Sequence, residues 1–213
     1  MRKMITVKIN GEERQYPQGA TYEDVANDYQ QEYENLIALA ARDGKIRELF
    51  KKLTRDCEVT FFTLKDDVGN KTYVRSATML FLKAVFDVYG REAAQSCRVE
   101  FAIGNGSYIS PKGKINATEE NAAKIRNRMR ELVEAKTPFL KRSYSLDNAM
   151  ELFRKEGMQD KEKLFRYRRG SFVNIYEMDG YYDYYYGYML PNAGYVKWFD
   201  VIALSLIHIS EPT

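Results

Sequence analysis

The sequence predicts an α+β fold with two domains, and three observations support that class. Residues 4–64 carry strand and hairpin patterns interrupted by one short helix, which is typical of a small mixed sheet. A polar stretch at 65–71 then separates this part from 73–89, where apolar side chains recur at helical spacing. Helix and strand patterns alternate through most of the remaining chain. We therefore place the two domains at residues 1–65 and 66–203.

The first domain opens with a predicted β-hairpin. Residues 4–9 (MITVKI) alternate between apolar and polar side chains and are rich in β-branched residues. Asn10-Gly11 follows at once, and this dipeptide is a strong signal for the tight two-residue turn that joins antiparallel strands. The segment 13–17 (ERQYP) is then predicted to return as the second strand.

A short helix and two more strands complete the first domain. Thr21 and Asp24 have the spacing of a capping box, so a helix is predicted to start there and to run to about Tyr29. Residues 36–42 (LIALAAR) and 57–64 (CEVTFFTL) are predicted strands. A hairpin followed by a helix and two strands is the element order of a ubiquitin-like β-grasp domain.

The second domain is predicted to be a larger α+β unit. Its first helix should end at Gly90, because glycine favours helix C-termini. Acidic residues followed by basic ones favour a helix beginning at Thr118. Asp179-Gly180 marks a second tight turn between strands. In chain order the predicted elements are helix 73–89, hairpin 97–110, helix 118–136, strand 139–145, helix 146–157 and hairpin 171–190.

The last predicted hairpin is unusually rich in tyrosine, with six in the eight positions from Tyr181 to Tyr188. Alternation along a strand places Tyr182, Tyr184, Tyr186 and Tyr188 on one face. Two interpretations stay open. Tyr184 and Tyr186 are candidates to stack nucleotide bases, but aromatic side chains in strands also pack across the sheet and against helices.

A basic and aromatic run, KEKLFRYRR, precedes the tyrosine segment at residues 161–169. Basic side chains can bind phosphates while aromatic side chains stack on bases, so the run is a candidate contact with nucleic acid or a nucleotide. A solvated helical turn ahead of a strand is the alternative interpretation. The candidate residues are Lys161, Lys163, Arg166, Tyr167, Arg168 and Arg169.

The composition excludes several classes of site. His208 is the only histidine, so we expect neither a histidine general base nor a zinc site, and no metal is assigned. Cys57 and Cys97 lie far apart, as expected of buried reduced thiols. The N-terminus lacks the apolar run of a signal peptide, and no stretch approaches the roughly 20 apolar residues of a membrane span. We therefore expect a cytoplasmic protein without a membrane partner, and the net charge of +3 permits contact with nucleic acid.

Two known domains resemble these two parts of the chain. INGEERQYPQGATYEDVA, ARDGKIREL and FFTLKDDVG resemble a TGS domain, the ubiquitin-like unit of threonyl-tRNA synthetase and some GTPases. YVRSATMLFLKAV and VEFAIGNGSYIS, with the 118–136 helix and the 172–190 hairpin, resemble the editing domain of threonyl- and alanyl-tRNA synthetases. The resemblance implies a synthetase-editing-like α+β domain behind the β-grasp domain, with RNA or tRNA as a partner.

The chain departs from the editing pattern at the positions that carry its chemistry. The family places an HxxxH pair on the first helix of the domain and a CxxxH pair later. Ser76 and Leu80 fall near the first pair, and Tyr188 and Asn192 fall near the second. None of these side chains is a competent zinc ligand, so the resemblance implies a degenerate editing pocket without metal-dependent hydrolysis.

A narrower resemblance covers residues 151–200, which contain KEKLFRYRRGSF and DGYYDYYYGYMLPN. This run is similar to bacterial nucleoside kinases of the uridine-kinase type, which carry the synthetase-like pair before a P-loop kinase domain. The chain has no GxxxxGK[ST] motif, so the resemblance implies a missing C-terminal kinase domain that would use ATP and Mg²⁺. No cofactor is expected in the chain itself.

The last ten residues, 204–213 (LSLIHISEPT), depart from this family pattern. They resemble the translation of a sequencing adapter, and we expect them to be a non-native tail. An apolar strand with a frayed end is the alternative interpretation. On either interpretation, His208 has no functional role.

Three hypotheses of function follow. The first is a non-catalytic region that binds RNA or a nucleotide, or regulates a parent nucleoside kinase. The second is a metal-free aminoacyl-tRNA deacylase, in which Ser76, Thr78 and Asp183 would orient a water molecule. The third is a stand-alone tRNA- or RNA-binding module related to threonyl-tRNA synthetase. The sequence leaves the ligand and the oligomeric state open.

Overall fold

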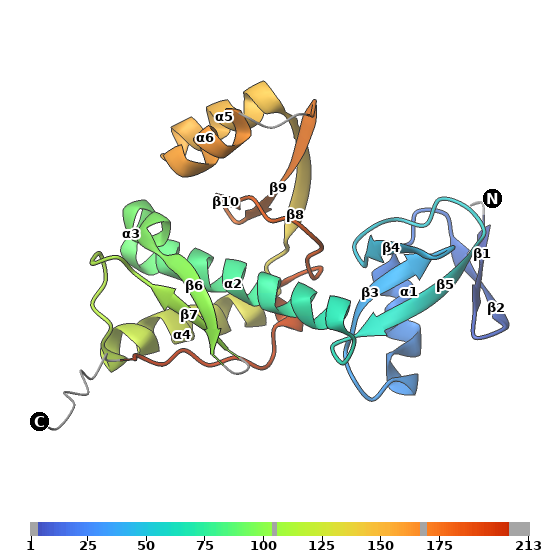
Figure 1. Cartoon of the computed structure of the whole chain (residues 1–213). Helices are drawn as coiled ribbons and strands as arrows, with labels where there is room; N and C mark the ends of the chain where they lie inside the picture. Colours follow the sequence, from blue (N-terminus) through green and yellow to red (C-terminus); the bar gives the residue numbers. More distant parts are fainter. Residues whose placement is uncertain (1–3, 104–105, 167–169, 205–213) are drawn as a thin grey trace, which may run out of the picture.

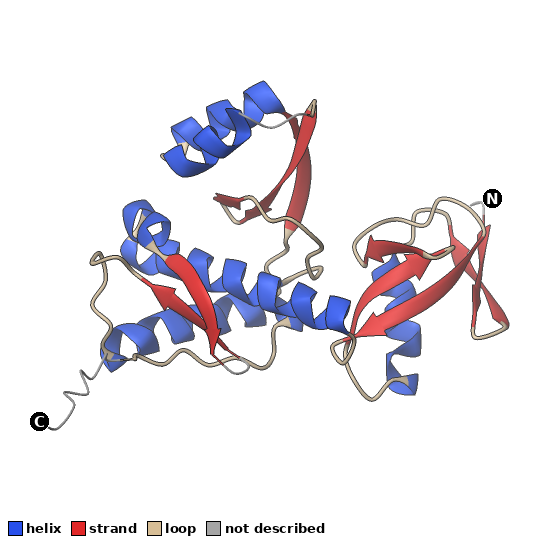
Figure 2. Ribbon diagram, viewed as in Figure 1, coloured by secondary structure: helices blue, strands red, loops and turns tan. Residues whose placement is uncertain are grey.

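The computed structural model describes residues 4–103, 106–166 and 170–204. Figure 1 shows an N-terminal unit, made of a mixed sheet and one α-helix, and a second part that is reached through a long helix. Figure 2 shows that the second part arranges its helices around two separate small sheets. Among the described residues, no helix combines the length and the apolar character needed to cross a lipid bilayer.

The N-terminal unit is a five-stranded sheet in the order β2-β1-β5-β3-β4, in which β1 and β5 are parallel and the other neighbours are antiparallel. This topology confirms the predicted β-grasp domain, with β4 as an edge strand that the sequence patterns missed. The elements are β1 (Met4–Ile9), β2 (Glu12–Pro17), α1 (Tyr22–Tyr29), η1 (Gln30–Glu32), β3 (Ile37–Arg42), β4 (Lys45–Glu48) and β5 (Cys57–Thr63).

Local sequence signals explain where these elements turn and start. Asn10 and Gly11 both have positive φ angles, 51° and 89°, as the two-residue hairpin turn requires. The predicted capping box is present at α1: the backbone N–H of Thr21 donates to Asp24 Oδ2 at 2.7 Å, and the Asp24 N–H donates to Thr21 Oγ1 at 3.1 Å. Two N–H groups that would otherwise lack partners are thereby satisfied.

Strand β3 is buried on both of its faces. Ile37 and Ala40 belong to the core of the N-terminal unit, whereas Ala38 and Leu39 belong to the core of the second part. This double burial explains why the strand is continuously apolar and does not alternate. The two parts of the chain therefore share a packed boundary along this strand.

The predicted linker at 65–71 is wrong for most of its length, because α2 (Asp67–Tyr89) begins within it. Asp66 precedes the helix, and its carboxylate accepts from the backbone N–H of Thr63 at 2.7 Å. Gly69 lies in the predicted linker, but in the structure it allows the start of α2 to pack closely on the backbone of Thr63. A Cβ atom on Gly69 would lie 2.8 Å from the carbonyl carbon of Thr63, inside van der Waals contact.

The second part confirms the predicted helices and strands except in details. The hairpin over 97–110, the helix capped by Thr118 and the helix that follows residue 145 are all present. Two short helices, α3 and α6, were not predicted as separate elements. After α2 come α3 (Arg91–Ser96), β6 (Arg98–Ile103), β7 (Gly106–Ser110), α4 (Glu119–Glu134), β8 (Leu140–Ser145), α5 (Leu146–Lys155), α6 (Gln159–Arg166), β9 (Phe172–Met178), β10 (Tyr181–Asp183) and η2 (Ala193–Tyr195).

The tyrosine segment is a strand only at its start. The Asp179-Gly180 turn is present, with φ angles of 45° and 78°, but β10 ends at Asp183. There the Asp183 carboxylate accepts from the N–H of Tyr184 at 2.6 Å, and the Tyr184 ring packs edge-on against Phe165 with centroids 4.9 Å apart. The predicted strand to residue 190 is therefore wrong, since the chain leaves the sheet and returns toward α2.

Candidate functional site

The predicted editing-pocket residues on α2 are buried in the core. Ser76 and Leu80 have no exposed surface. The Ser76 hydroxyl donates to the carbonyl of Thr72 at 2.8 Å and accepts from the N–H of Leu190 at 3.0 Å. Both hydrogen-bonding roles of the hydroxyl are therefore filled by backbone, and Ser76 joins α2 to the segment after the tyrosines.

The other two predicted pocket residues lie on that returning segment. Tyr188 is half-buried, and its carbonyl accepts from Arg75 Nη1 at 2.6 Å. Asn192 caps η2, where its side-chain oxygen accepts from the N–H of Gly194 at 3.0 Å. The structure therefore brings Ser76 next to this segment, and of the four positions Asn192 alone lines the groove described below.

The residues proposed for a metal-free deacylase have other partners. Thr78 donates to the carbonyl of Val74 at 2.9 Å and is two residues from Ser76, so the two side chains leave α2 on different faces. Asp183 is buried and forms an ion pair with Lys161. The described contacts do not bring Asp183 to Ser76 or Thr78, so this trio is not assembled around a water molecule.

The basic run is only partly available to a ligand. Lys161 is committed to Asp183, and Arg166 lies 3.5 Å from Glu162. Lys163 is exposed on α6. The remaining residues of the run, which are Tyr167, Arg168 and Arg169, lie outside the described residues.

The two candidate stacking tyrosines differ in exposure. Tyr184 is half-buried against Phe165, and its role as a base contact stays a prediction. Tyr186 is 86% exposed and stays a candidate. The expected row of tyrosines on one face of a strand is not formed, because β10 ends before either residue.

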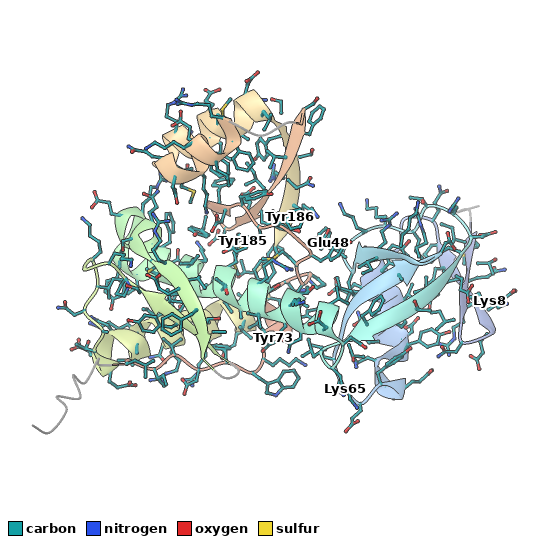
Figure 3. All side chains as sticks on the ribbon, viewed as in Figure 1. Lys8, Glu48, Lys65, Tyr73, Tyr185 and Tyr186 are labelled. Carbon is teal, nitrogen blue, oxygen red and sulfur yellow. The ribbon has the colours of Figure 1, made fainter. Side chains whose placement is uncertain are left out.

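A buried carboxylate from the N-terminal unit organises the boundary between the two parts. Glu48, at the end of β4, is 2% exposed, and Figure 3 shows it on the side of the unit that faces Tyr185. Lys141 Nζ lies 3.0 Å from Glu48 Oε2. The Tyr176 hydroxyl and the N–H of Met189 approach Oε1 at 2.5 and 3.2 Å. All three donors come from the second part, so Glu48 bonds the two parts together.

Burial shifts the pKa values of two groups near this carboxylate, Tyr176 and Arg75. Burial, followed by the Glu48 charge, holds the pKa of Tyr176 far above its ordinary value, so its hydroxyl remains a donor. Its oxygen also lies 2.9 Å from the carbonyl of Gly187. Arg75 packs against Gly187, and burial lowers the pKa of Arg75 without removing its charge. The Glu48 carboxylate is therefore held by three donors from the second part of the chain.

An open groove of about 740 Å³ lies beside this joint. One wall comes from the N-terminal unit and the other from the segments that flank η2 and β8. These two segments pair with each other, because the N–H of Phe139 donates to the carbonyl of Pro191 at 3.1 Å. The groove is lined by Glu23, Phe50, Lys51, Lys52, Lys136, Pro138, Phe139, Leu140, Lys141, Arg142, Pro191 and Asn192.

Five of the lining residues are basic and one is acidic. Lys141 is paired with Glu48, and Arg142 lies 2.9 Å from Glu177. These two cations therefore have partners inside the protein. The other three basic residues supply the uncompensated charge of the groove.

Lys51 and Lys52 on one wall and Lys136 on the other are exposed. Within the described ranges, no ion pair includes any of these three lysines. The acidic lining residue, Glu23, accepts from the Asn192 amide at 3.4 Å. The groove therefore carries unpaired positive charge from both parts of the chain, next to apolar lining residues.

Sequence patterns missed this groove because its lysines come from distant segments. Lys51-Lys52 is a short basic pair, and Lys136 stands just after a predicted helix. Neither is a basic run. The pair Lys51-Lys52 and the single Lys136 lie in different predicted domains, and only the fold brings them together.

Comparisons with known proteins give one consistent match. No family model matches the chain. The chain is 29% identical over 210 residues to the threonine–tRNA ligase of Thermotoga neapolitana, which covers 95% of the chain and 31% of the ligase. Against the threonine–tRNA ligase of Porphyromonas gingivalis it is 24% identical over 202 residues, 92% of the chain and 30% of the ligase.

The chain is therefore homologous to the N-terminal part of threonine–tRNA ligases. It spans about a third of the length of the curated relatives it matches. The comparisons give no support to the nucleoside kinase resemblance.

Proposed function

We propose that this chain is a tRNA-binding region, and that the groove between its two parts holds the phosphate backbone of the RNA. The observation that carries the proposal is the free positive charge of Lys51, Lys52 and Lys136 on opposite walls of one open groove. The homology to threonine–tRNA ligases supports tRNA as the nucleic acid. A cytoplasmic location fits such a partner.

The chemistry of the groove suits a backbone contact. Lysine is a compact point charge that neutralises phosphates without reading bases, so this contact should position RNA and contribute little sequence specificity. The exposed Pro138 and Leu140 and the half-buried Phe50 supply an apolar surface beside the lysines. Ribose rings and base faces can pack on such a surface, whereas acidic side chains would repel the RNA.

A titration of the chain with uncharged tRNA tests the proposal. We expect log Kd to depend steeply on log salt, because each neutralised phosphate releases bound cations. The combined substitution Lys51→Gln, Lys52→Gln and Lys136→Gln should weaken binding at low salt and reduce the salt slope by about 2 to 3.

The matched control changes three exposed lysines outside the groove: Lys8→Gln, Lys65→Gln and Lys197→Gln. Figure 3 shows Lys8 and Lys65 on sides of the N-terminal unit away from Glu48, the partner of groove residue Lys141. This variant has the same net charge as the groove variant. The proposal is wrong if tRNA does not bind at low salt, or if the two variants lose the same affinity.

The kinase parent stays a prediction with a separate test. The DNA downstream of codon 203 should continue into a strand, a GxxxxGK[ST] loop and a helix if the parent is a kinase. The deacylase hypothesis also stays a prediction, and assays on charged tRNAs test it. The arrangement of Ser76, Thr78 and Asp183 does not favour it.

A further inference from the structure

A second, smaller pocket lies on the N-terminal unit next to the groove. Its volume is about 360 Å³, which is near the lower end of the range for small-molecule sites. Four of its six lining residues are cations, and none is a carboxylate. The pocket is lined by Tyr22, Arg42, Arg47, Lys51, Lys52 and Thr54.

One wall of this pocket carries a buried hydroxyl whose hydrogen has no acceptor. Tyr22, the first residue of α1, is 1% exposed, and its hydroxyl makes no well-formed hydrogen bond within the described structure. The Arg42 guanidinium interacts with this hydroxyl, but it carries only donors and cannot accept the hydroxyl hydrogen. A buried hydroxyl without a hydrogen-bond acceptor destabilises the folded state unless a ligand or a water molecule accepts its hydrogen.

The other polar groups of the pocket are also donors. Arg42 Nη1 donates to Thr54 Oγ1 at 3.0 Å, which occupies the hydroxyl that could act as an acceptor. Arg42 and Arg47 are half-buried, and none of the ion pairs among the described residues includes either of them. The amides at the start of α1 do not contribute, because the N–H of Tyr22 donates to the carbonyl of Lys51 at 3.0 Å.

The hydroxyl keeps its proton in this setting. Burial raises the pKa of Tyr22, although Arg42 and Arg47 oppose the shift. The pocket therefore presents one hydroxyl donor together with two arginine and two lysine side chains. A ligand that fits must carry acceptors, negative charge and no hydrogen-bond donors of its own at the contact.

We propose that this pocket binds a phosphate group, either inorganic phosphate or the terminal phosphate of a small ester such as a nucleoside monophosphate. The guanidinium groups of Arg42 and Arg47 would bind phosphate oxygens, the Tyr22 hydroxyl would donate to a third oxygen, and Lys51 and Lys52 would add charge. This site overlaps the groove at Lys51 and Lys52, but the phosphate proposal does not require that tRNA binds there. The discriminating residue is Tyr22, which does not line the groove.

Tyr22→Phe tests the proposal without threatening the fold. It removes a buried hydroxyl that has no acceptor, so the variant should be at least as stable as the parent chain. Tyr29→Phe is the matched control, since Tyr29 lies on the same helix, is 1% exposed and also has a hydroxyl without a partner. Tyr29 lines neither pocket.

Calorimetric titrations with inorganic phosphate, adenosine monophosphate and adenosine, at matched ionic strength in chloride, provide the readout. We expect saturable 1:1 binding of phosphate or the monophosphate and no binding of adenosine. Tyr22→Phe should weaken this binding about tenfold or more, the effect of losing a hydrogen bond to a charged group, while Tyr29→Phe leaves it unchanged. Tighter binding of adenosine monophosphate than of phosphate would assign the site to an ester, and equal binding would assign it to the free ion.

Two results would overturn the proposal: no saturable binding of either phosphate compound, or equal losses for Tyr22→Phe and Tyr29→Phe. Two variants distinguish phosphate binding in the pocket from tRNA binding in the groove. Lys136→Gln should leave phosphate binding unchanged because Lys136 does not line this pocket, and Tyr22→Phe should leave tRNA binding unchanged.

Discussion

Lys141 Nζ lies 3.0 Å from the buried Glu48 carboxylate, and this ion pair crosses the boundary between the N-terminal unit and the second part. The lysine retains some exposure, with 15% of its side-chain surface accessible, whereas Glu48 has almost none. Lys141 also lines the groove. The same side chain therefore fixes the boundary and contributes to the surface where we expect RNA to bind.

Glu48→Gln should lower the free energy of unfolding by about 3 kcal/mol, because it leaves Lys141 next to a neutral amide at a buried site. Urea unfolding followed by circular dichroism measures the change. Glu12→Gln is the control: its ion pair with Arg14 is exposed and 3.9 Å long, so the loss should stay below about 0.5 kcal/mol. Equal losses for the two variants would mean that Glu48 does not hold the parts together.

Gly69→Ala should destabilise the chain, although alanine ordinarily favours a helix over glycine by about 1 kcal/mol. The added Cβ would meet the backbone of Thr63, which cannot rotate away, and we expect a net loss of about 2 kcal/mol. Asn70→Ala, at the next and exposed helix position, should change stability by less than about 0.5 kcal/mol. A stabilised Gly69→Ala variant would show that α2 does not pack tightly on β5.

Cys97 should make stability depend on pH in the alkaline range. Burial raises the pKa of its thiol from 9.0 to about 11. The folded state then holds its proton more tightly than the unfolded state, so this contribution is complete below pH 9.0 and is lost as pH rises to about 11. A rise from 9.0 to about 11 corresponds to about 2.7 kcal/mol, and the partial exposure of Cys97 reduces the expected contribution to about 2 kcal/mol.

The free energy of unfolding, measured between pH 8 and pH 11, should fall less steeply with rising pH for Cys97→Ala than for the parent chain. Burial also raises the pKa of Tyr16 and Tyr181 above the ordinary value of 10.0, so these tyrosines lower stability over the same pH range. The quantity of interest is therefore the difference between the two curves. Parallel curves would show that the Cys97 thiol is not protected by burial.

Tyr184 and Tyr186 should respond differently to removal of the ring. Tyr184→Ala should cost about 2 kcal/mol of stability, because its half-buried ring packs against Phe165. Tyr186→Ala should cost less than about 0.5 kcal/mol. If Tyr186 stacks on a base, its alanine variant should also weaken tRNA binding by about 1 to 3 kcal/mol, measured in the titration described above. A large loss of stability for Tyr186→Ala would contradict its exposed position.

Local signals predicted the elements whose cause is local. The Asn10-Gly11 and Asp179-Gly180 turns and the capping box at Thr21 all depend on residues within three positions of each other, and all are present. The β-grasp order followed from these signals. Strand β10 was predicted too long, because alternation continues in the sequence beyond the point where Asp183 turns the chain away.

The boundary between the parts could not be predicted in the same way. Glu48 is bonded to residues 93, 128 and 141 positions away, and no local pattern indicates such partners. Gly69 looked like part of a linker because the sequence does not show which backbone it touches. The groove and the smaller pocket beside it could not be predicted for the same reason, since tertiary packing brings their cations together.

Helix α2 has 23 residues and is about 34 Å long. Its first turn packs on the end of β5, Arg75 bonds the returning segment, and Lys83 donates to the carbonyl of Asp179 at 2.7 Å near the far end. Both walls of the groove are thus attached to one helix, which fixes the distance between them in the free protein. If RNA binds in the groove as proposed, the protein should need little reorganisation, and the entropic cost of binding should come mainly from the RNA.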